Sequence, residues 1–355
     1  MFPFSRPRFR ASVSCAVLAG LGIAAGLFAI DVPQARAATT NGFSSDIQQT
    51  TYMGLPAYRL SDGKTEAVVV PQIGRIMRYG KVGGRNILWN AESWNWKARD
   101  WKNYGGEKDW LSPQSSWGEF HGSNIWPPDP VLDGTQYDAK AVAPGVLEIR
   151  SQVSPGTGIR ITRTFSFAPN GDFVIKLTAS KDGGAAVRAG LWSIAQVVPG
   201  EAVFVSASPH SVYKKGYLGL IGNSVVASAW PDMIRVNPSV KNGCKIGVDS
   251  DVASIVSISH GIAFLSSTPK LPGQYPDGPD IAGCPVELYV NDESSKFYCE
   301  LELLGPLVHA KAGSTWSMTI HWSLHNISTS ASSPSQLAEA ARRLLYGNTL
   351  GKTGN

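Results

Sequence analysis

Tryptophan is concentrated in one short stretch of the chain. Residues 89–126 contain seven of the eleven tryptophans. A tryptophan ring can cover the apolar C–H face of a sugar, while nearby amide and carboxylate groups bind the sugar hydroxyls. The candidate binding residues in and beside this stretch are Trp110, Trp117, Trp126, Gln114, Glu107 and Asp129. The stretch therefore predicts a carbohydrate-binding surface. The alternative is a satellite core beneath a long loop, because tryptophan is usually mostly buried.

A second candidate site is an acidic hairpin near the C-terminus. Residues 286–291 and 296–303 alternate apolar and polar side chains around a predicted turn at residues 292–295. Successive side chains of a strand face opposite ways, so one face of this hairpin is apolar and the other is polar. The polar face carries Glu287, Tyr289, Tyr298, Glu300 and Glu302.

The register of this hairpin decides which carboxylates meet. A turn that is symmetric about residues 293 and 294 pairs Glu287 with Glu300, and Tyr289 with Tyr298. Facing carboxylates repel unless water screens them or a cation, a shared proton or a ligand offsets the cost. A shared proton raises one pKa, which suits a general acid or base. The alternative is a plain solvated face, and a slip of one residue would undo the pairing.

Short strands are predicted to position these residues. Residues 159–167 alternate apolar and polar side chains, lead into Asn170-Gly171, a preferred pair for a two-residue turn, and residues 173–177 return. Residues 66–70 are another β-branched run, and glycine and proline punctuate the chain at short intervals. These patterns predict an all-β sandwich or barrel. Glycines and prolines interrupt residues 89–126, which we expect to form a long, loop-rich insertion.

One helix is predicted at the C-terminus. Ser333 and Gln336 form a capping box around Pro334 at the first helical position, and Gly347 ends the helix. Its apolar stripe consists of Leu337, Ala341, Leu344 and Leu345. The predicted organisation is a signal peptide over residues 1–37, a β domain over residues 38–330, and a helix with a tail over residues 331–355.

The first 37 residues have the layout of a secretory signal peptide. Three arginines precede an apolar run over residues 11–30, and Ala35-Arg36-Ala37 is a small-x-small cleavage pattern. A membrane anchor is the alternative, because the run is almost long enough to span a bilayer. We expect cleavage near Ala37 and a periplasmic or secreted protein that does not contact the membrane.

Charge and cysteine content narrow the partners. Residues 1–37 carry four basic residues and one acidic residue, so their removal lowers the net charge from +5 to +2. No basic block remains, which argues against nucleic acid as a partner. Cys244, Cys284 and Cys299 remain, an odd number without a Cys-x-x-Cys spacing. We expect no metal or other cofactor, and the sequence leaves the oligomeric state open.

Several segments, taken in order, resemble the galactose mutarotase-like superfamily. Residues 74–79 (GRIMRY) and 86–89 (NILW) resemble the opening of its domains. Residues 105–108 (GGEK), 126–128 (WPP) and 300–306 (ELELLGP) resemble an uncharacterised bacterial branch, the domain-of-unknown-function family numbered 4380. The resemblance covers roughly residues 50 to 325. It implies an antiparallel β-supersandwich with a sugar-sized groove on its concave face, and Arg75 is carried over from the opening motif as a binding residue.

The resemblance also implies a reaction. Mutarotases interconvert sugar anomers without a cofactor: a glutamate on a late strand takes the proton of the anomeric hydroxyl, and a histidine protonates the ring oxygen. Glu302, just before Leu303-Leu304-Gly305-Pro306, is the best match to that glutamate, and Glu300 is next. The stretch that matches the histidine-bearing strand, residues 192–196, has no histidine, so His121 or His210 would have to supply the acid from a loop.

Three functions follow as expectations. The first is an exported sugar-active enzyme, an aldose 1-epimerase-like isomerase. The second is a non-catalytic carbohydrate-binding domain, which the missing histidine favours. The third is a polysaccharide lyase-like enzyme, which would use Tyr298 as its base and Arg163 to neutralise charge.

Overall fold

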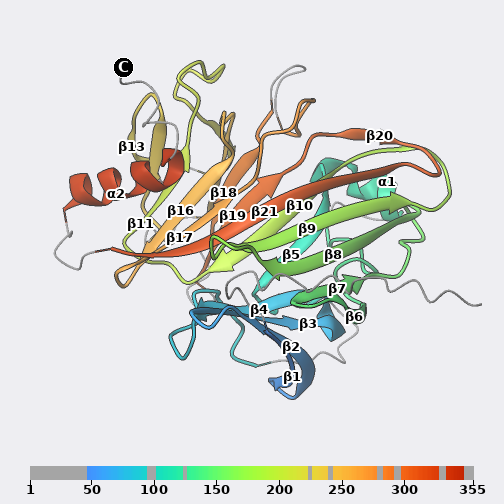
Figure 1. Cartoon of the computed structure of the whole chain (residues 1–355). Helices are drawn as coiled ribbons and strands as arrows, with labels where there is room; N and C mark the ends of the chain where they lie inside the picture. Colours follow the sequence, from blue (N-terminus) through green and yellow to red (C-terminus); the bar gives the residue numbers. More distant parts are fainter. Residues whose placement is uncertain are drawn as a thin grey trace, which may run out of the picture. The chain divides into compact units, whose positions relative to one another are not determined.

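The computed structural model describes residues 46–93, 101–122, 126–222, 226–238, 243–277, 283–291, 297–327 and 333–347. The predicted signal peptide and the end of the C-terminal tail lie outside these residues. The described strands form two sheets in which every pair is antiparallel (Figure 1). No helix in the described part of the chain is both long and apolar enough to cross a membrane.

The first sheet holds eleven of the described strands. Its order is β1 (Asp46–Tyr52), β2 (Leu55–Ser61), β3 (Thr65–Val70), β4 (Arg75–Lys81), β5 (Glu107–Ser112), β10 (Val187–Val197), β19 (Cys299–Leu304), β18 (Val286–Val290), β15 (Cys244–Val248) and β12 (Leu218–Ile221), with β20 (Val308–Ala310) also paired to β10. Strands far apart in the sequence therefore lie side by side at its centre.

The second sheet holds the other ten described strands. Its order is β13 (Val226–Ala229), β14 (Met233–Val236), β11 (Ala202–Ser206), β16 (Ser254–Ser259), β17 (Ile262–Ser267), β21 (Thr315–Asn326), β9 (Phe173–Lys181), β8 (Ile159–Phe167), β7 (Val146–Arg150) and β6 (Asp138–Ala143). The helical segments are η1 (Pro71–Ile73), η2 (Gln114–Ser116), α1 (Trp117–His121) and α2 (Pro334–Tyr346). The all-β sandwich with one C-terminal helix is confirmed.

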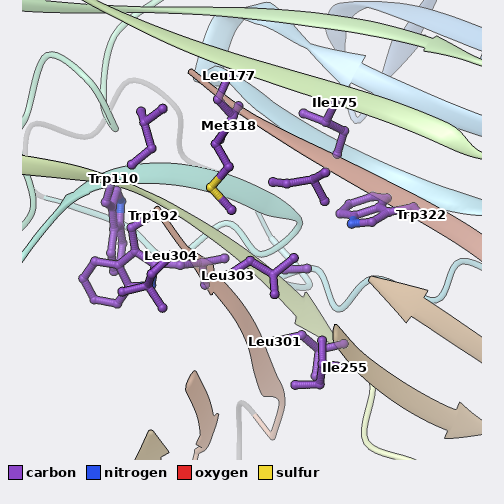
Figure 2. Close-up of a cluster of buried hydrophobic side chains, with 14 of the residues drawn as sticks. Trp110, Ile175, Leu177, Trp192, Ile255, Leu301, Leu303, Leu304, Met318 and Trp322 are labelled. Carbon is purple, nitrogen blue, oxygen red and sulfur yellow. The ribbon is translucent and has the colours of Figure 1, made fainter. Parts of the chain in front are cut away.

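The two sheets pack face to face over one apolar core. Leu301 and Leu303 project from β19 of the first sheet, and Ile175 and Trp322 project from β9 and β21 of the second (Figure 2). All four side chains are at most 2% exposed. Alternate side chains of these strands therefore face the other sheet and form the core between the two sheets.

The hairpin of β8 and β9 forms as predicted, but its turn differs. The Gly171 N–H donates to the Ala168 carbonyl at 2.8 Å, so Pro169 and Asn170 are the central residues. Gly171 follows with a φ of 88°, in the left-handed region that glycine tolerates. The expected two-residue turn at Asn170-Gly171 is wrong, because the fixed φ of a proline suits the first central position of a turn.

The tryptophan-rich stretch is not purely an insertion. Its residues 107–112 form β5, which lies between β4 and β10 in the first sheet. The expectation of a long loop-rich segment is therefore wrong at its centre. Trp94 and Trp96 lie outside the described residues.

Helix α2 covers the outer face of the second sheet (Figure 1). Ser333 and Gln336 form the predicted capping box. Leu337, Ala341 and Leu345 pack into a second apolar cluster with side chains of β11, β16 and β17. The helix therefore shields the face of the second sheet that is turned away from the core.

Candidate functional site

A groove of about 350 Å³ lies over the first sheet. Its floor is formed by neighbouring strands β5, β10, β19, β18 and β15. The aromatic side chains that line it are Trp101, Trp110, Trp126, Trp192, Tyr289 and Tyr298. The polar side chains that line it are Asn103, Gln114, Gln196, Lys245 and Glu300. The volume is near the lower end of the roughly 300–1,000 Å³ of small-molecule sites.

The aromatic wall is built from tryptophans packed edge to face. The ring centroids of Trp110 and Trp192 are 5.4 Å apart at an interplanar angle of 84°. Those of Trp101 and Trp126 are 4.7 Å apart at 75°. Trp126 remains 44% exposed, whereas Trp110 is 5% exposed. The wall therefore combines fixed inner rings with one accessible ring.

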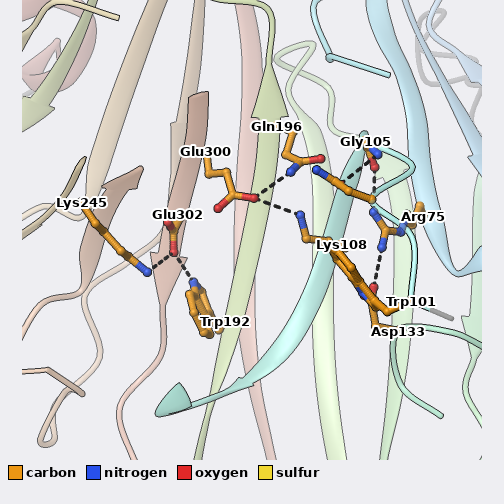
Figure 3. Close-up of polar contacts among 11 residues, drawn as sticks. Arg75, Trp101, Gly105, Lys108, Asp133, Trp192, Gln196, Lys245, Glu300 and Glu302 are labelled. Carbon is orange, nitrogen blue, oxygen red and sulfur yellow. Dashed lines mark hydrogen bonds and ion pairs between the residues drawn. The ribbon is translucent and has the colours of Figure 1, made fainter. Parts of the chain in front are cut away.

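Arg75 supports this wall from behind. Its guanidinium is buried and pairs with Asp133 at 2.8 Å, and it donates to the Gly105 carbonyl at 3.0 Å. Asp133 in turn accepts from the indole N–H of Trp101 at 2.7 Å (Figure 3). Arg75, predicted as a sugar-binding residue, thus acts on the groove by holding Trp101.

The acidic hairpin has a different register from the predicted one. Glu287 lies opposite Glu302, and Tyr289 lies opposite Glu300. The predicted pairs, Glu287 with Glu300 and Tyr289 with Tyr298, are wrong by two residues. A shift of two keeps every side chain on its predicted face, because the side-chain period of a strand is two. The predicted turn at residues 292–295 lies outside the described residues.

Glu300 is the carboxylate that faces the groove. It accepts from Lys108 Nζ at 3.2 Å and from Gln196 Nε2 at 2.8 Å (Figure 3). Its side chain is 12% exposed, whereas that of Lys108 is 2% exposed. Burial lowers the pKa of Lys108, and the Glu300 carboxylate partly offsets this effect. The pair places one accessible carboxylate on the groove floor.

Lys245 joins two fully buried carboxylates. Its Nζ is 2.6 Å from Glu287 and 3.0 Å from Glu302, and lies 4.4 Å from the Trp192 ring centroid. The Trp192 indole N–H also donates to Glu302 at 2.7 Å (Figure 3). Burial raises the pKa of Glu287 to about 8 and that of Glu302 to about 7, although Lys245 lowers both. Two carboxylates and one ammonium can therefore hold a proton near neutral pH.

Two buried polar atoms of groove-lining residues have no hydrogen-bond partner among the described residues. They are Trp110 Nε1 and Gln196 Oε1. Buried polar atoms are normally paired, so these atoms are candidates for contact with a ligand. Within the described ranges, no three or more histidine, cysteine or acidic side chains are arranged to hold a metal ion.

Glu107 lies on the opposite side of β5 from the groove. It is fully buried, forms an ion pair with Arg163, and accepts from the Ser193 hydroxyl at 2.9 Å. Arg163 also pairs with Asp109 at 2.6 Å. These groups lie between the two sheets, so Glu107 contributes to the packing of the sheets and does not reach the groove. The lyase-like pairing of Tyr298 with Arg163 has no support, because Arg163 is buried away from the groove.

Three further predicted residues lie behind the wall. Trp117 is 2% exposed and donates to the Leu111 carbonyl at 2.8 Å. Asp129 accepts from the Val131 N–H at 2.8 Å. His121 borders a separate small hollow together with both of them. They therefore belong to the packing beneath the aromatic wall.

His210 lies elsewhere on the surface. It is exposed, and its backbone N–H donates to the Ser208 hydroxyl at 3.0 Å. Neither His210 nor His121 lines the groove. Of the predicted residues, Trp110, Trp126, Gln114, Tyr298 and Glu300 line it directly, while Glu287 and Glu302 lie beneath it.

The sequence prediction missed Lys245 and Gln196. Lys245 is the single polar side chain of β15, whereas Gln196 shares β10 with Arg188 and Ser193. Both are buried, at 9% and 1% exposure. The lone lysine of an apolar strand could have marked Lys245, because such a group is buried only when it is paired, but β10 carries no comparable signal for Gln196.

The fold is similar to that of solved galactose mutarotase-like structures. A galactose mutarotase-like protein from Lactobacillus casei ATCC 334 matches with a TM-score of 0.53 at 8% identity, over 79% of this chain and 100% of that one. Galactose 1-epimerase from Lactobacillus acidophilus NCFM matches with a TM-score of 0.52 at 8% identity, over 81% and 100%. No family model and no curated protein matches. The galactose mutarotase-like fold is confirmed, and the bacterial branch stays a prediction.

Proposed function

We propose that the groove binds a carbohydrate. The observation that carries this proposal is the meeting of an aromatic wall and a polar floor around one cavity of about 350 Å³. Aromatic faces cover the C–H faces of sugar rings, and the amide, ammonium and carboxylate of Gln196, Lys245 and Glu300 are suited to sugar hydroxyls. The names of the two solved proteins with this fold support a sugar ligand.

Trp126→Ala tests this proposal. Trp126 is 44% exposed, so its loss should leave the fold intact while it removes a stacking surface. We expect binding of the best ligand on a glycan array to weaken by about 10-fold to 100-fold, which corresponds to roughly 1.4–2.8 kcal/mol. Isothermal titration with that ligand measures the change.

The matched control is Val142→Ala on β6, a position that is also 44% exposed. It should bind as the wild type does. Trp117→Ala is a poor test, because Trp117 is 2% exposed and its loss would damage the core. A glycan array without any bound sugar, or equal affinity in Trp126→Ala and wild type, would refute the proposal.

A second candidate function is interconversion of sugar anomers. It is favoured by an accessible carboxylate and an ammonium on one groove floor, Glu300 and Lys245. Glu300 would take the proton of the anomeric hydroxyl as the bond between C1 and the ring oxygen breaks. Lys245 would give a proton to that ring oxygen, and both protons would return when the ring closes on the other face. In this assignment Glu302 acts through Lys245, to which it is paired.

Polarimetry of freshly dissolved α-glucose and α-galactose tests this reaction. We expect the wild type to accelerate the change in rotation and Glu300→Gln to lose at least about 100-fold of that rate, as for a general base. Glu302→Gln should retain more activity, because that side chain is buried beneath Lys245. Equal rates for wild type and Glu300→Gln would leave binding as the only proposed function.

A further inference from the structure

A second hollow of about 450 Å³ is lined in part by residues that are sequence neighbours of groove residues. Its lining includes Ser115, Arg188, Leu218, Gln274, Asp277 and Leu307. None of these residues belongs to the lining of the first groove. The second hollow is therefore a separate feature that a ligand of one sugar in the groove would not occupy.

Besides β10, two segments contribute residues to both hollows. Gln114 lines the groove, and its neighbours Pro113 and Ser115 line the second hollow. On β12, Ile221 lines the groove and Leu218 lines the second hollow. The two hollows therefore share segment 113–115 on one side and β12 on the other.

Strand β10 runs beneath both hollows. Arg188 in the second hollow, and Trp192 and Gln196 in the groove, are separated by even numbers of residues on this strand. Side chains at even spacing lie on the same face of a strand. At a rise of about 3.3 Å per residue, Arg188 lies about 13 Å along β10 from Trp192. A ligand that follows this face must therefore extend beyond the tryptophans to reach Arg188.

The far wall of the second hollow is held in place by hydrogen bonds. The Leu307 N–H donates to the Gln274 carbonyl at 2.7 Å, and the Cys284 N–H donates to the Pro276 carbonyl at 3.0 Å. The Tyr275 hydroxyl accepts from the Leu271 N–H at 3.0 Å and donates to the Leu271 carbonyl at 2.9 Å. Segment 274–277 is therefore a fixed wall on which polar side chains can be presented.

The chemistry of the second hollow differs from that of the groove. Arg188 donates to Gln274 Oε1 at 2.5 Å, and Asp277 and Ser115 add a carboxylate and a hydroxyl. Among the described residues that line it, the one aromatic residue is Tyr275, whose side chain is only 5% exposed and offers little ring surface to a ligand. Donors and acceptors of both kinds suit a hydroxyl-rich group.

We propose that the ligand is an oligosaccharide that follows β10, with one sugar stacked in the groove and the next sugars in the second hollow near Arg188. This inference rests on the proposed carbohydrate function and adds the length of the ligand to it. The tryptophans bind the first ring by its apolar face, and Arg188, Gln274 and Asp277 bind the hydroxyls of the following rings.

Isothermal titration with sugars of increasing length tests the inference. The probes are glucose, maltose and maltotetraose, followed by cello-oligosaccharides and β-1,4-galacto-oligosaccharides of the same lengths. The protein is residues 38–355, which is the chain without the predicted signal peptide. We expect the tetrasaccharide of at least one series to bind at least about 10-fold more tightly than its monosaccharide. Arg188→Ala should remove this gain and leave monosaccharide affinity unchanged.

Two further variants provide a second test and a control. Ser115→Trp should fill the second hollow and also remove the gain, because Ser115 is exposed within its lining. Arg150→Ala, at an exposed arginine of β7, is the matched control and should keep it. Equal affinity for mono- and tetrasaccharide, or a gain that survives both Arg188→Ala and Ser115→Trp, overturns the inference.

The outcomes separate this inference from the proposed function. If monosaccharides bind in a Trp126-dependent manner without any gain from length, the groove binds sugar and the second hollow does not. If none of the probes and no array sugar binds, the carbohydrate proposal fails and the inference fails with it.

Discussion

Replacement of Arg163 with methionine is expected to lower the free energy of unfolding by about 3–5 kcal/mol at neutral pH. The guanidinium is fully buried between the sheets, where it pairs with Glu107 and with Asp109 and donates to the Gly74 carbonyl at 2.6 Å. Its removal leaves two carboxylates buried without a counter-charge. Urea denaturation of wild type and variant at pH 7 measures the difference.

The matched control is Arg160→Met on the same strand. Arg160 projects from the other face of β8 and pairs with Asp182 at 3.3 Å, with 40% of the Asp182 side chain exposed. An ion pair at the surface contributes at most about 1 kcal/mol, so this variant should lose little stability. Equal losses in the two variants would show that the buried pairing is not what stabilises the sheets.

Acid should reduce the loss in Arg163→Met. Burial holds the pKa of Asp109 well above its usual range, and Arg163 partly offsets this. Without the guanidinium the folded-state pKa rises further above the unfolded value. A raised carboxyl pKa contributes stability that is present below the unfolded value and is lost as the pH rises through the folded value. The deficit should therefore be larger at pH 7 than at pH 4.

Arg163 also shows how far the sequence predicts the fold. The alternation over residues 159–167 predicts β8 with its observed bounds, and Arg163 occupies an apolar-face position between Ile161 and Phe165. A charge at such a position indicates a buried ion pair. Its partners could not be predicted, because Glu107 belongs to the other sheet and meets Arg163 only when the two sheets pack.

In the hairpin of β18 and β19, the alternation of side chains determines which face each residue occupies, whereas the turn determines which residues pair. Period-2 alternation places Glu287, Glu300 and Glu302 on one face, as the structure has them. The register depends on the geometry of the connecting turn, which side-chain alternation does not encode. The predicted pairing was therefore wrong while the predicted face was right.

Only some of the groove-lining residues could be predicted from the sequence. The tryptophan-rich stretch predicted Trp110 and Trp126 as lining residues because seven indoles in one segment are conspicuous. Lys245 and Trp192 come from β15 and β10, which reach the groove only through the strand order of the first sheet. Strand order follows from long-range packing, so local composition could not place these residues beside one another.

Replacement of Lys245 with methionine is the second change with a large expected effect. Methionine can fill the space of the aliphatic stem, but it leaves Glu287 and Glu302 buried without the ammonium that lies 2.6 and 3.0 Å from them. We expect the free energy of unfolding to fall by about 3–5 kcal/mol at pH 8. Binding of the groove ligand should weaken as well, because Lys245 lines the groove.

The pH dependence gives this prediction its distinguishing feature. A glutamate has an ordinary pKa of 4.5, whereas the folded values are about 8 for Glu287 and about 7 for Glu302. The folded state therefore binds more protons than the unfolded state between these values. Their contribution to stability is fully present below pH 4.5 and is lost as the pH rises toward 8. Lys245 lowers both folded values, so its removal makes the loss steeper.

Denaturation curves of wild type and Lys245→Met at pH 5 and pH 8 test this directly. At pH 5 both carboxyls are protonated in the folded variant, and we expect a deficit of only about 1 kcal/mol from lost hydrogen bonds. Lys140→Met, which removes a surface pair to Glu148 with 68% of the lysine side chain exposed, should be nearly neutral at both pH values. Adding Glu287→Gln to Lys245→Met should recover part of the stability at pH 8. A Lys245→Met deficit of the same size at both pH values would mean that its loss reflects packing, and that the two carboxylates do not share their charge with the lysine beneath the groove.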